Sequence, residues 1–318
     1  MRRRRLATRN LTAGAWLLGL LALLPAPALA QENDTSFDPS VGCPAYGPGV
    51  GPQLLIDEAH KNLHTAGGRY ASFAAVASHD GFRVEPSTAS FLEAPPPEGA
   101  ILVIANARGV ADPADSAFPP AEIARLHAWI EGGGSLLLIT DHKPFGTAAR
   151  ALAASFGIEM SDGHVRDTEH AARELPGPDF LEFTRANGLL GDHPILRGRS
   201  PSETLSRVVT FGGQALRVGP NLTTLLRLGP AAEAVANPDQ PTSPVEKVGG
   251  WSQAVALEIG KGRLVVVGEA GMFGAQIIQG EAARRAGLPR ELRFGMNHPG
   301  TDDRQFLLNT LHWLARLL

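Results

Sequence analysis

The first half of the chain alternates short apolar runs with amphipathic stretches. Residues 53–57, 100–105 and 135–140 are apolar at nearly every position, rather than at every second one. Patterns with helical periodicity cover residues 69–79, 119–131 and 147–156, and a short strand pattern covers residues 82–85. Strands that are apolar throughout are typical of a parallel sheet with both faces covered. The pattern therefore predicts an α/β fold with helices on both faces of a mostly parallel sheet.

The second half of the chain is less regular. Residues 205–211 and 222–228 are predicted strands, and residues 254–259 and 263–268 form a hairpin pattern around Gly260-Lys261-Gly262. Residues 302–318 have the periodicity of a closing amphipathic helix. Residues 157–187 are polar and irregular, and residues 231–249 are predicted to form an exposed loop. We therefore expect the sheet to be completed by strands from this half.

The first 30 residues have the pattern of an export signal. Five arginines and no acid occupy this segment, residues 11–24 are apolar, and small residues precede a cleavage position after Ala30. The apolar run is shorter than the roughly 20 residues that a membrane-spanning helix needs. We expect an exported protein, periplasmic or secreted, with no stable membrane span after cleavage. The paired arginines leave both the general and the twin-arginine route open.

Two further segments follow the predicted signal, residues 1–30. Residues 31–51 are rich in Pro and Gly and are predicted to be an extended leader, and residues 52–318 a single α/β domain. Within it, residues 157–200 form an irregular insertion that we interpret as a candidate lid. Since the signal holds five arginines and no acid, the formal net charge of −3 becomes −8 without it. An acidic domain argues against nucleic-acid binding through a broad basic face.

Polar residues gather where the predicted parallel strands end, which is where open sheets of this type bind ligands. These residues are Asp57, Glu58, Asn106, Asp141, His142 and Glu269. His60 and His64 follow the first strand at a spacing of four, so on a helical turn they would share a face. Arg69 lies just beyond them. The alternative interpretation is that these polar residues only cap turns and helices.

The available side chains restrict the chemistry. The turn at residues 139–143 lacks the Ser or Cys that a nucleophile elbow requires, and neither a dinucleotide fingerprint nor a phosphate-binding Walker loop is present. Carboxylates and imidazoles remain. They suit a divalent metal that activates water, or a metal-free acid–base pair acting on a hydroxylated substrate. The predicted catalytic residues are Asp57, His60, Asp141, His142 and Glu269, and the predicted ligand-binding residues are Glu58, His64, Arg69 and Asn106.

Several motifs together resemble a known superfamily. They are Asp57-Glu-Ala-His-Lys-Asn-Leu-His-Thr65, Gly68-Arg-Tyr70, Gly132-Gly-Gly-Ser-Leu-Leu-Leu-Ile-Thr-Asp-His142, Asp192-His-Pro-Ile195 and Gly268-Glu-Ala-Gly-Met272. In this order they resemble a bacterial family of the class I glutamine amidotransferase-like superfamily, near the ThuA-like (trehalose-utilisation) proteins. The resemblance covers residues 52–318 and implies a flavodoxin-like three-layer sandwich.

True amidotransferases of that superfamily carry a cysteine at the elbow, whereas this chain has Thr140 and Asp141 there. Glutaminase activity is therefore disfavoured. One hypothesis is a hydrolase or isomerase-like enzyme acting on a carbohydrate. The other is a non-catalytic module that binds a small ligand or an envelope partner in the same cleft. The sequence leaves the cofactor, including any divalent metal, and the oligomeric state open.

Overall fold

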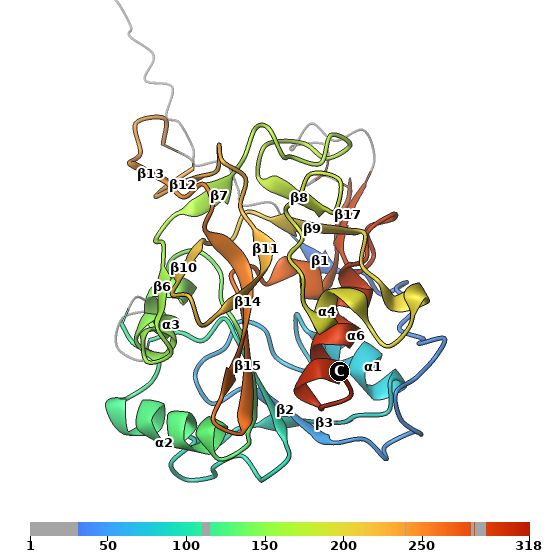
Figure 1. Cartoon of the computed structure of the whole chain (residues 1–318). Helices are drawn as coiled ribbons and strands as arrows, with labels where there is room; N and C mark the ends of the chain where they lie inside the picture. The colour runs from blue at the N-terminus through green and yellow to red at the C-terminus, as the bar shows by residue number, and fades with distance from the viewer. Residues whose placement is uncertain (1–30, 110–114, 239, 281–282, 284–290) are drawn as a thin grey trace, which may run out of the picture.

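A nine-stranded sheet organises the molecule (Figure 1). The computed structural model describes residues 31–109, 115–238, 240–280, 283 and 291–318. The strand order is β3-β2-β4-β5-β15-β14-β10-β6, and β11 also pairs with β14. The strands of this sheet are β2 (Gln53–Asp57), β3 (Arg83–Ser87), β4 (Ile101–Ala105), β5 (Ser135–Ile139), β6 (Ile158–Met160), β10 (Leu216–Val218), β11 (Thr223–Arg227), β14 (Ser252–Ile259) and β15 (Gly262–Val267).

The sheet has a parallel part and an antiparallel part. Strands β3, β2, β4, β5 and β15 pair with one another in parallel, as the apolar runs at β2, β4 and β5 predict. Strand β14 then turns back against β15, which confirms the predicted hairpin, and β10, β11 and β6 continue with antiparallel pairing. The fold is therefore mixed α/β with a large, mostly parallel sheet and few helices.

Helices cover both faces of the parallel strands because alternate residues of each strand point to opposite sides. Leu54 and Ile56 pack in one core cluster with α1 (Ala71–His79) and α6 (Asp303–Leu314). Leu55 packs in a second cluster with α2 (Pro120–Glu131) and α3 (Phe145–Ala154). In Figure 1 the two pairs of helices lie on opposite sides of the strands. All four helices agree with predicted helices within a few residues.

The structure corrects two predictions for the second half. The predicted exposed loop at residues 231–249 is wrong, since β12 (Glu233–Val235) and β13 (Val245–Lys247) form a small sheet with β7 (His164–Arg166). The irregular segment also contains β6 and β8 (Phe180–Thr184), which pairs with β9 (Arg207–Phe211). The strands β6, β7, β12 and β13 have three residues each, which is too short to show a periodicity in the sequence.

The leader packs against the domain. Strand β1 (Glu32–Asn33) pairs with β16 (Ala275–Ile278), which also pairs with β17 (Leu292–Gly295). Phe37, Val41 and Tyr46 contact the core cluster of the α1 face. The remaining short elements are α4 (Pro194–Arg197), η1 (Pro201–Glu203) and η2 (Gly271–Phe273).

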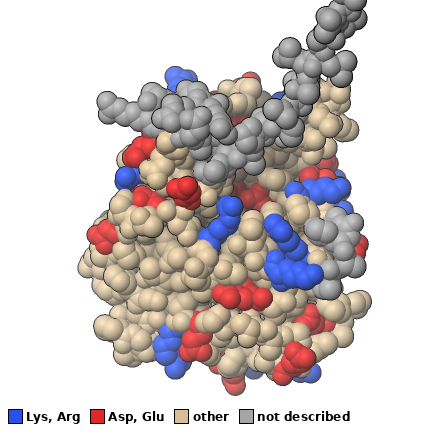
Figure 2. Space-filling model, turned by 180° about the vertical axis from the view of Figure 1, so that it is seen from behind, with Lys and Arg blue, Asp and Glu red and all other residues tan. Residues whose placement is uncertain are grey.

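The predicted signal, residues 1–30, lies outside the described residues. Within the ranges that the structure describes, every helix is too short or too polar to cross a membrane. On the face shown in Figure 2, acidic and basic side chains are interspersed among a larger number of uncharged ones.

Candidate functional site

A cavity of about 150 Å³ lies beyond the carboxyl ends of the parallel strands β4, β5 and β15. It is lined by Gln31, Leu63, His64, Arg69, Asn106, Asp141, His142, Phe145, His164, Phe211, Glu269, Gly271, Gln276 and Phe294. Three of these residues, Asn106, Asp141 and Glu269, follow β4, β5 and β15, by one or two positions. The topology thus brings together polar residues that are far apart in the sequence.

Six of the nine predicted site residues line this cavity. They are His64, Arg69, Asn106, Asp141, His142 and Glu269. Asp57, Glu58 and His60 are not among the lining residues. The predicted helical turn that would align His60 with His64 does not form, because residues 58–70 run through turns and Lys61 has a φ of 51°.

Glu269 is the most deeply buried acid of the cavity, at 1% exposed. Its carboxyl oxygens accept hydrogen bonds from the backbone N–H groups of Gly271 and Met272, the latter at 2.8 Å. Burial raises the pKa of Glu269 well above its usual range, and the nearby negative charge of Asp141 raises it further. The carboxyl group of Glu269 therefore holds its proton more strongly than an exposed glutamate does.

Asp141 and His142 form the turn between β5 and α3. The backbone N–H of His142 donates to the Asp141 carboxylate at 2.8 Å, which closes a tight local turn. The His142 side chain is 43% exposed, and its ring centroid lies 5.0 Å from that of His164. Asp141 therefore lines the cavity with a partly exposed side chain, whereas the side chain of Glu269 is enclosed.

His64 is the enclosed base of the cavity. Its ring contacts Tyr70, with 4.6 Å between centroids, and burial lowers its pKa to about 3, helped by the positive charge of Arg69. His64 is therefore neutral at neutral pH. Among the described residues, its Nδ1 atom has no hydrogen-bond partner.

Two amide oxygens of the cavity are similarly unpaired. Within the described part of the chain, neither the Oδ1 atom of Asn106 nor the Oε1 atom of Gln276 has a hydrogen-bond partner. Asn106 also has a φ of 49°, a left-handed conformation that Asn tolerates better than most residues. Buried polar atoms without partners are costly, so they point to a polar ligand or to ordered water.

Asp57 and His60 belong to a separate buried cluster. The Nδ1 atom of His60 lies 2.9 Å from the Asp57 carboxylate, and its Nε2 atom lies 3.1 Å from Glu122. The imidazole packs against Phe91 and Phe118, with centroid distances of 4.8 and 4.7 Å. Burial alone would lower the pKa of His60, but its hydrogen bonds and the two carboxylates outweigh burial and raise that pKa. This arrangement ties the β2 turn to α2.

Glu58 lies in the turn that leads back to the cavity. Its carboxylate accepts a hydrogen bond from the backbone N–H of Ala66 at 2.9 Å. This is the capping role that the alternative interpretation gives to polar residues after strands.

The sequence did not single out several lining residues, notably Gln31, His164, Phe211, Gln276 and Phe294. His164 begins the three-residue strand β7, inside the segment expected as a candidate lid. Gln276 lies on β16, which pairs with the leader. These positions depend on pairing between distant segments, and no local motif marks them.

A metal site was one of the open alternatives. Within the residues that the structure describes, no group of three or more His, Cys, Asp and Glu side chains is arranged to hold an ion. The lining residues nevertheless supply a buried carboxyl group with a raised pKa, a second carboxyl group and a neutral imidazole. These groups can transfer protons without a cofactor.

Comparison with known proteins shows similarity at the level of the fold. No protein-family model and no curated protein matches the chain. The N-terminal domain of mmIFT52 has a TM-score of 0.57 at 15% identity, over 82% of this chain and 97% of that one. A ThuA-like protein from Bacteroides uniformis has a TM-score of 0.43 at 12% identity, over 86% and 93% of the two chains. Another from Parabacteroides merdae has 0.40 at 13% identity, over 83% and 89%.

The likeness to the N-terminal domain of mmIFT52 shows a shared fold, and at 15% identity it shows the fold alone. ThuA-like proteins are also among the solved structures to which this chain is similar, at lower TM-scores.

Proposed function

We propose that the chain is an exported acid–base enzyme, a hydrolase or isomerase, that acts on a small hydroxylated substrate such as a carbohydrate. The observation that carries this proposal is the pair of carboxyl groups in one cavity. Asp141 and Glu269 follow neighbouring parallel strands, β5 and β15, yet only Glu269 is fully enclosed. In this proposal the fold is a flavodoxin-like sandwich of the class I glutamine amidotransferase-like type.

The two carboxyl groups have different environments, which is the usual basis for separate acid and base roles. Glu269, with its raised pKa, is the proton donor to a departing or rearranging oxygen. Asp141, which is partly exposed and lines the same cavity, is the proton acceptor. A positioned acid and base together contribute on the order of 10²–10⁴-fold to a rate.

The other lining residues suit the binding of hydroxyl groups. Asn106 and Gln276 present amides, and neutral His64 presents an imidazole that both donates and accepts hydrogen bonds. The volume of about 150 Å³ is below the roughly 300 Å³ at which pockets for drug-sized ligands begin. We therefore propose a substrate portion of about the size of one sugar ring.

Covalent catalysis at the elbow is not part of the proposal. Thr140 takes the position next to Asp141 and is 1% exposed, and its hydroxyl accepts a hydrogen bond from the Gln214 side chain. A hydroxyl that is enclosed and engaged in this way is poorly placed to attack a substrate. Its environment supports the earlier inference against glutaminase activity.

The second candidate function is ligand binding without turnover. The unpaired polar atoms of His64, Asn106 and Gln276 favour it, because they need a ligand but no reaction. In this case the cavity would hold a sugar or an envelope component.

A thermal-shift screen of sugars, followed by product analysis of every hit, separates the two functions. Catalysis predicts product formation by the wild type and a loss of about 10²-fold or more in Asp141→Asn, with stabilisation by the sugar retained. Asp192→Asn, at an exposed carboxylate paired with Arg197, is the matched control and should retain activity. Stabilisation without product supports the binding module. A screen with neither stabilisation nor product contradicts both.

A further inference from the structure

Gln31 is part of the cavity wall. It lines the cavity together with Arg69, and its side-chain oxygen accepts a hydrogen bond from Nη1 of Arg69 at 3.3 Å. Gln31 is also the first residue after the cleavage position predicted from the sequence. The residue that export would make N-terminal therefore lines the cavity.

The residues after Gln31 fix its position. Strand β1 pairs with β16, with Asn33 opposite the cavity residue Gln276. The Asn33 side chain donates to the carbonyl of Gly68 at 2.8 Å, next to Arg69. The backbone N–H of Asp34 donates to the carbonyl of Ala275 at 2.9 Å. Contacts on both sides thus hold the start of the leader at the edge of the cavity.

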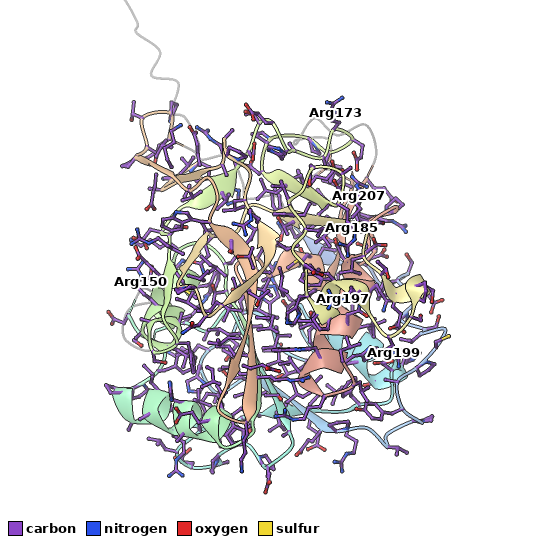
Figure 3. The ribbon with its side chains drawn as sticks, in the orientation of Figure 1. Arg150, Arg173, Arg185, Arg197, Arg199 and Arg207 are labelled. Carbon is purple, nitrogen blue, oxygen red and sulfur yellow. The ribbon has the colours of Figure 1, made fainter. Side chains whose placement is uncertain are left out.

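Arg69 has no acidic partner among the described residues, whereas several other arginines of the chain do. Four of the arginines labelled in Figure 3 form ion pairs: Arg150 with Asp162, Arg197 with Asp192, Arg199 with Glu203, and Arg207 with Glu174 and Glu182. Arg69 forms no ion pair with any residue that the structure describes, although it is half-buried. An arginine in a cavity without a carboxylate partner favours an anionic ligand.

We propose that removal of residues 1–30 leaves the α-ammonium group of Gln31 in the cavity, where it and Arg69 together bind the carboxylate of an acidic sugar. The inference rests on the proposed export and specifies the substrate class of the proposed site. Cleavage by the signal peptidase would then complete the binding site.

The charge of the new terminus supports this assignment. An α-amino group has a pKa of about 7.7–8.0, so most of it is charged at neutral pH. In the uncut chain the same nitrogen is an uncharged amide, and the site has one cation fewer. A planar guanidinium can form two parallel hydrogen bonds to a carboxylate, and the ammonium group adds a further charged donor.

The glutamine side chain offers a form of the protein without the α-ammonium charge. An N-terminal glutamine can cyclise: its α-nitrogen attacks the side-chain carbonyl carbon, the C–N bond to the amide nitrogen breaks, and ammonia leaves. The resulting lactam has no positive charge. Comparison of the open and cyclised forms therefore tests the α-ammonium group together with the side-chain amide that bonds Arg69, and comparison with the full chain, which keeps that amide, separates the two.

The test measures the dissociation constants of D-glucuronate and D-glucose by calorimetry for three forms of the protein. These are residues 31–318 with an open Gln31, the lactam form, and the full chain 1–318. We expect glucuronate to bind the open form about tenfold or more tightly than glucose, as charge-assisted hydrogen bonds suggest. We expect a similar weakening of glucuronate binding in the lactam form, in the full chain and in Arg69→Gln. Arg197→Gln is the control for loss of a surface arginine.

Equal affinity of glucuronate for all three forms would overturn the role of the α-ammonium group. Equal affinity of the open form for glucose and glucuronate, or no binding of glucuronate, would overturn the anionic ligand. Mass spectrometry of the exported protein must find Gln31 as the first residue, and any other start overturns the inference. Turnover of a neutral sugar without glucuronate binding would leave the proposed function intact while this inference fails.

Discussion

His64 provides a quantitative test of how enclosed the cavity is. Its side chain is 4% exposed, and its pKa falls from 6.5 to about 3 because burial penalises the charged form. The unfolded chain binds a proton near pH 6.5, whereas the folded protein binds it only near pH 3. The neutral histidine therefore contributes stability above pH 6.5 that is lost as the pH falls through this window.

The magnitude follows from the difference between the two pKa values. Each unit corresponds to about 1.4 kcal/mol, so full protonation of folded His64 costs about 5 kcal/mol. Between pH 7.5 and pH 5, protonation of the unfolded chain alone lowers the free energy of unfolding by about 2 kcal/mol. A typical domain has only about 5–15 kcal/mol of stability, so this loss is readily measured.

The assay is urea denaturation of the wild type and His64→Gln at pH 7.5, 6.5 and 5. As the pH falls from 7.5 to 5, the free energy of unfolding of the wild type should decrease by about 2 kcal/mol more than that of His64→Gln. His79→Gln, at an exposed position of α1, is the control and should follow the wild type. If His64→Gln and the wild type lose stability in parallel, His64 is not the enclosed neutral base described above.

Three further predictions concern the groups around the cavity. Glu122→Ala should lower the free energy of unfolding in urea by about 3–5 kcal/mol, because it leaves buried His60 without one of its carboxylates, while exposed Glu98→Ala should have little effect. Gly213→Ala should lower the free energy of unfolding by about 1–2 kcal/mol or more, because Gly213 has a φ of 70° and a Cβ atom there would meet Glu269. Gly219→Ala, where a Cβ atom would meet nothing, is the control, and equal stabilities of the two variants would contradict this packing. The kcat/KM of the proposed enzyme should fall as the pH rises through the raised pKa of Glu269, because the proton donor is lost, and a rate that keeps rising with pH would rule out Glu269 as the acid.

The parallel strands β2, β4 and β5 were predictable because they are buried on both faces and have to be apolar along their length. The apolar runs also indicated where the strands end. The residues that follow those ends, Asn106, Asp141 and Glu269, line one cavity. The sequence did not show how the chain continues after β2. The left-handed Lys61 breaks the expected helical turn, and the Asp57 carboxylate is held by His60 and Asn62 instead of reaching the cavity.

The opposite wall of the cavity could not be predicted from local patterns. Strand β7 has three residues and β1 has two, so neither has a periodicity to detect. His164 and Gln31 reach the cavity because these strands pair with segments far away in the sequence. Such pairing depends on the whole fold, which single motifs do not encode.

The central claim is that Glu269 is the proton donor of the cavity, and a proton donor that works at neutral pH has to carry its proton there. Infrared spectroscopy measures this directly, because a protonated carboxyl group absorbs apart from carboxylates. At pH 7 the spectrum of the wild type minus that of Glu269→Gln should contain a protonated carboxyl band. Asp303→Asn identifies the signal of the other buried acid with a raised pKa. A difference spectrum with only a carboxylate band at Glu269 would contradict the account.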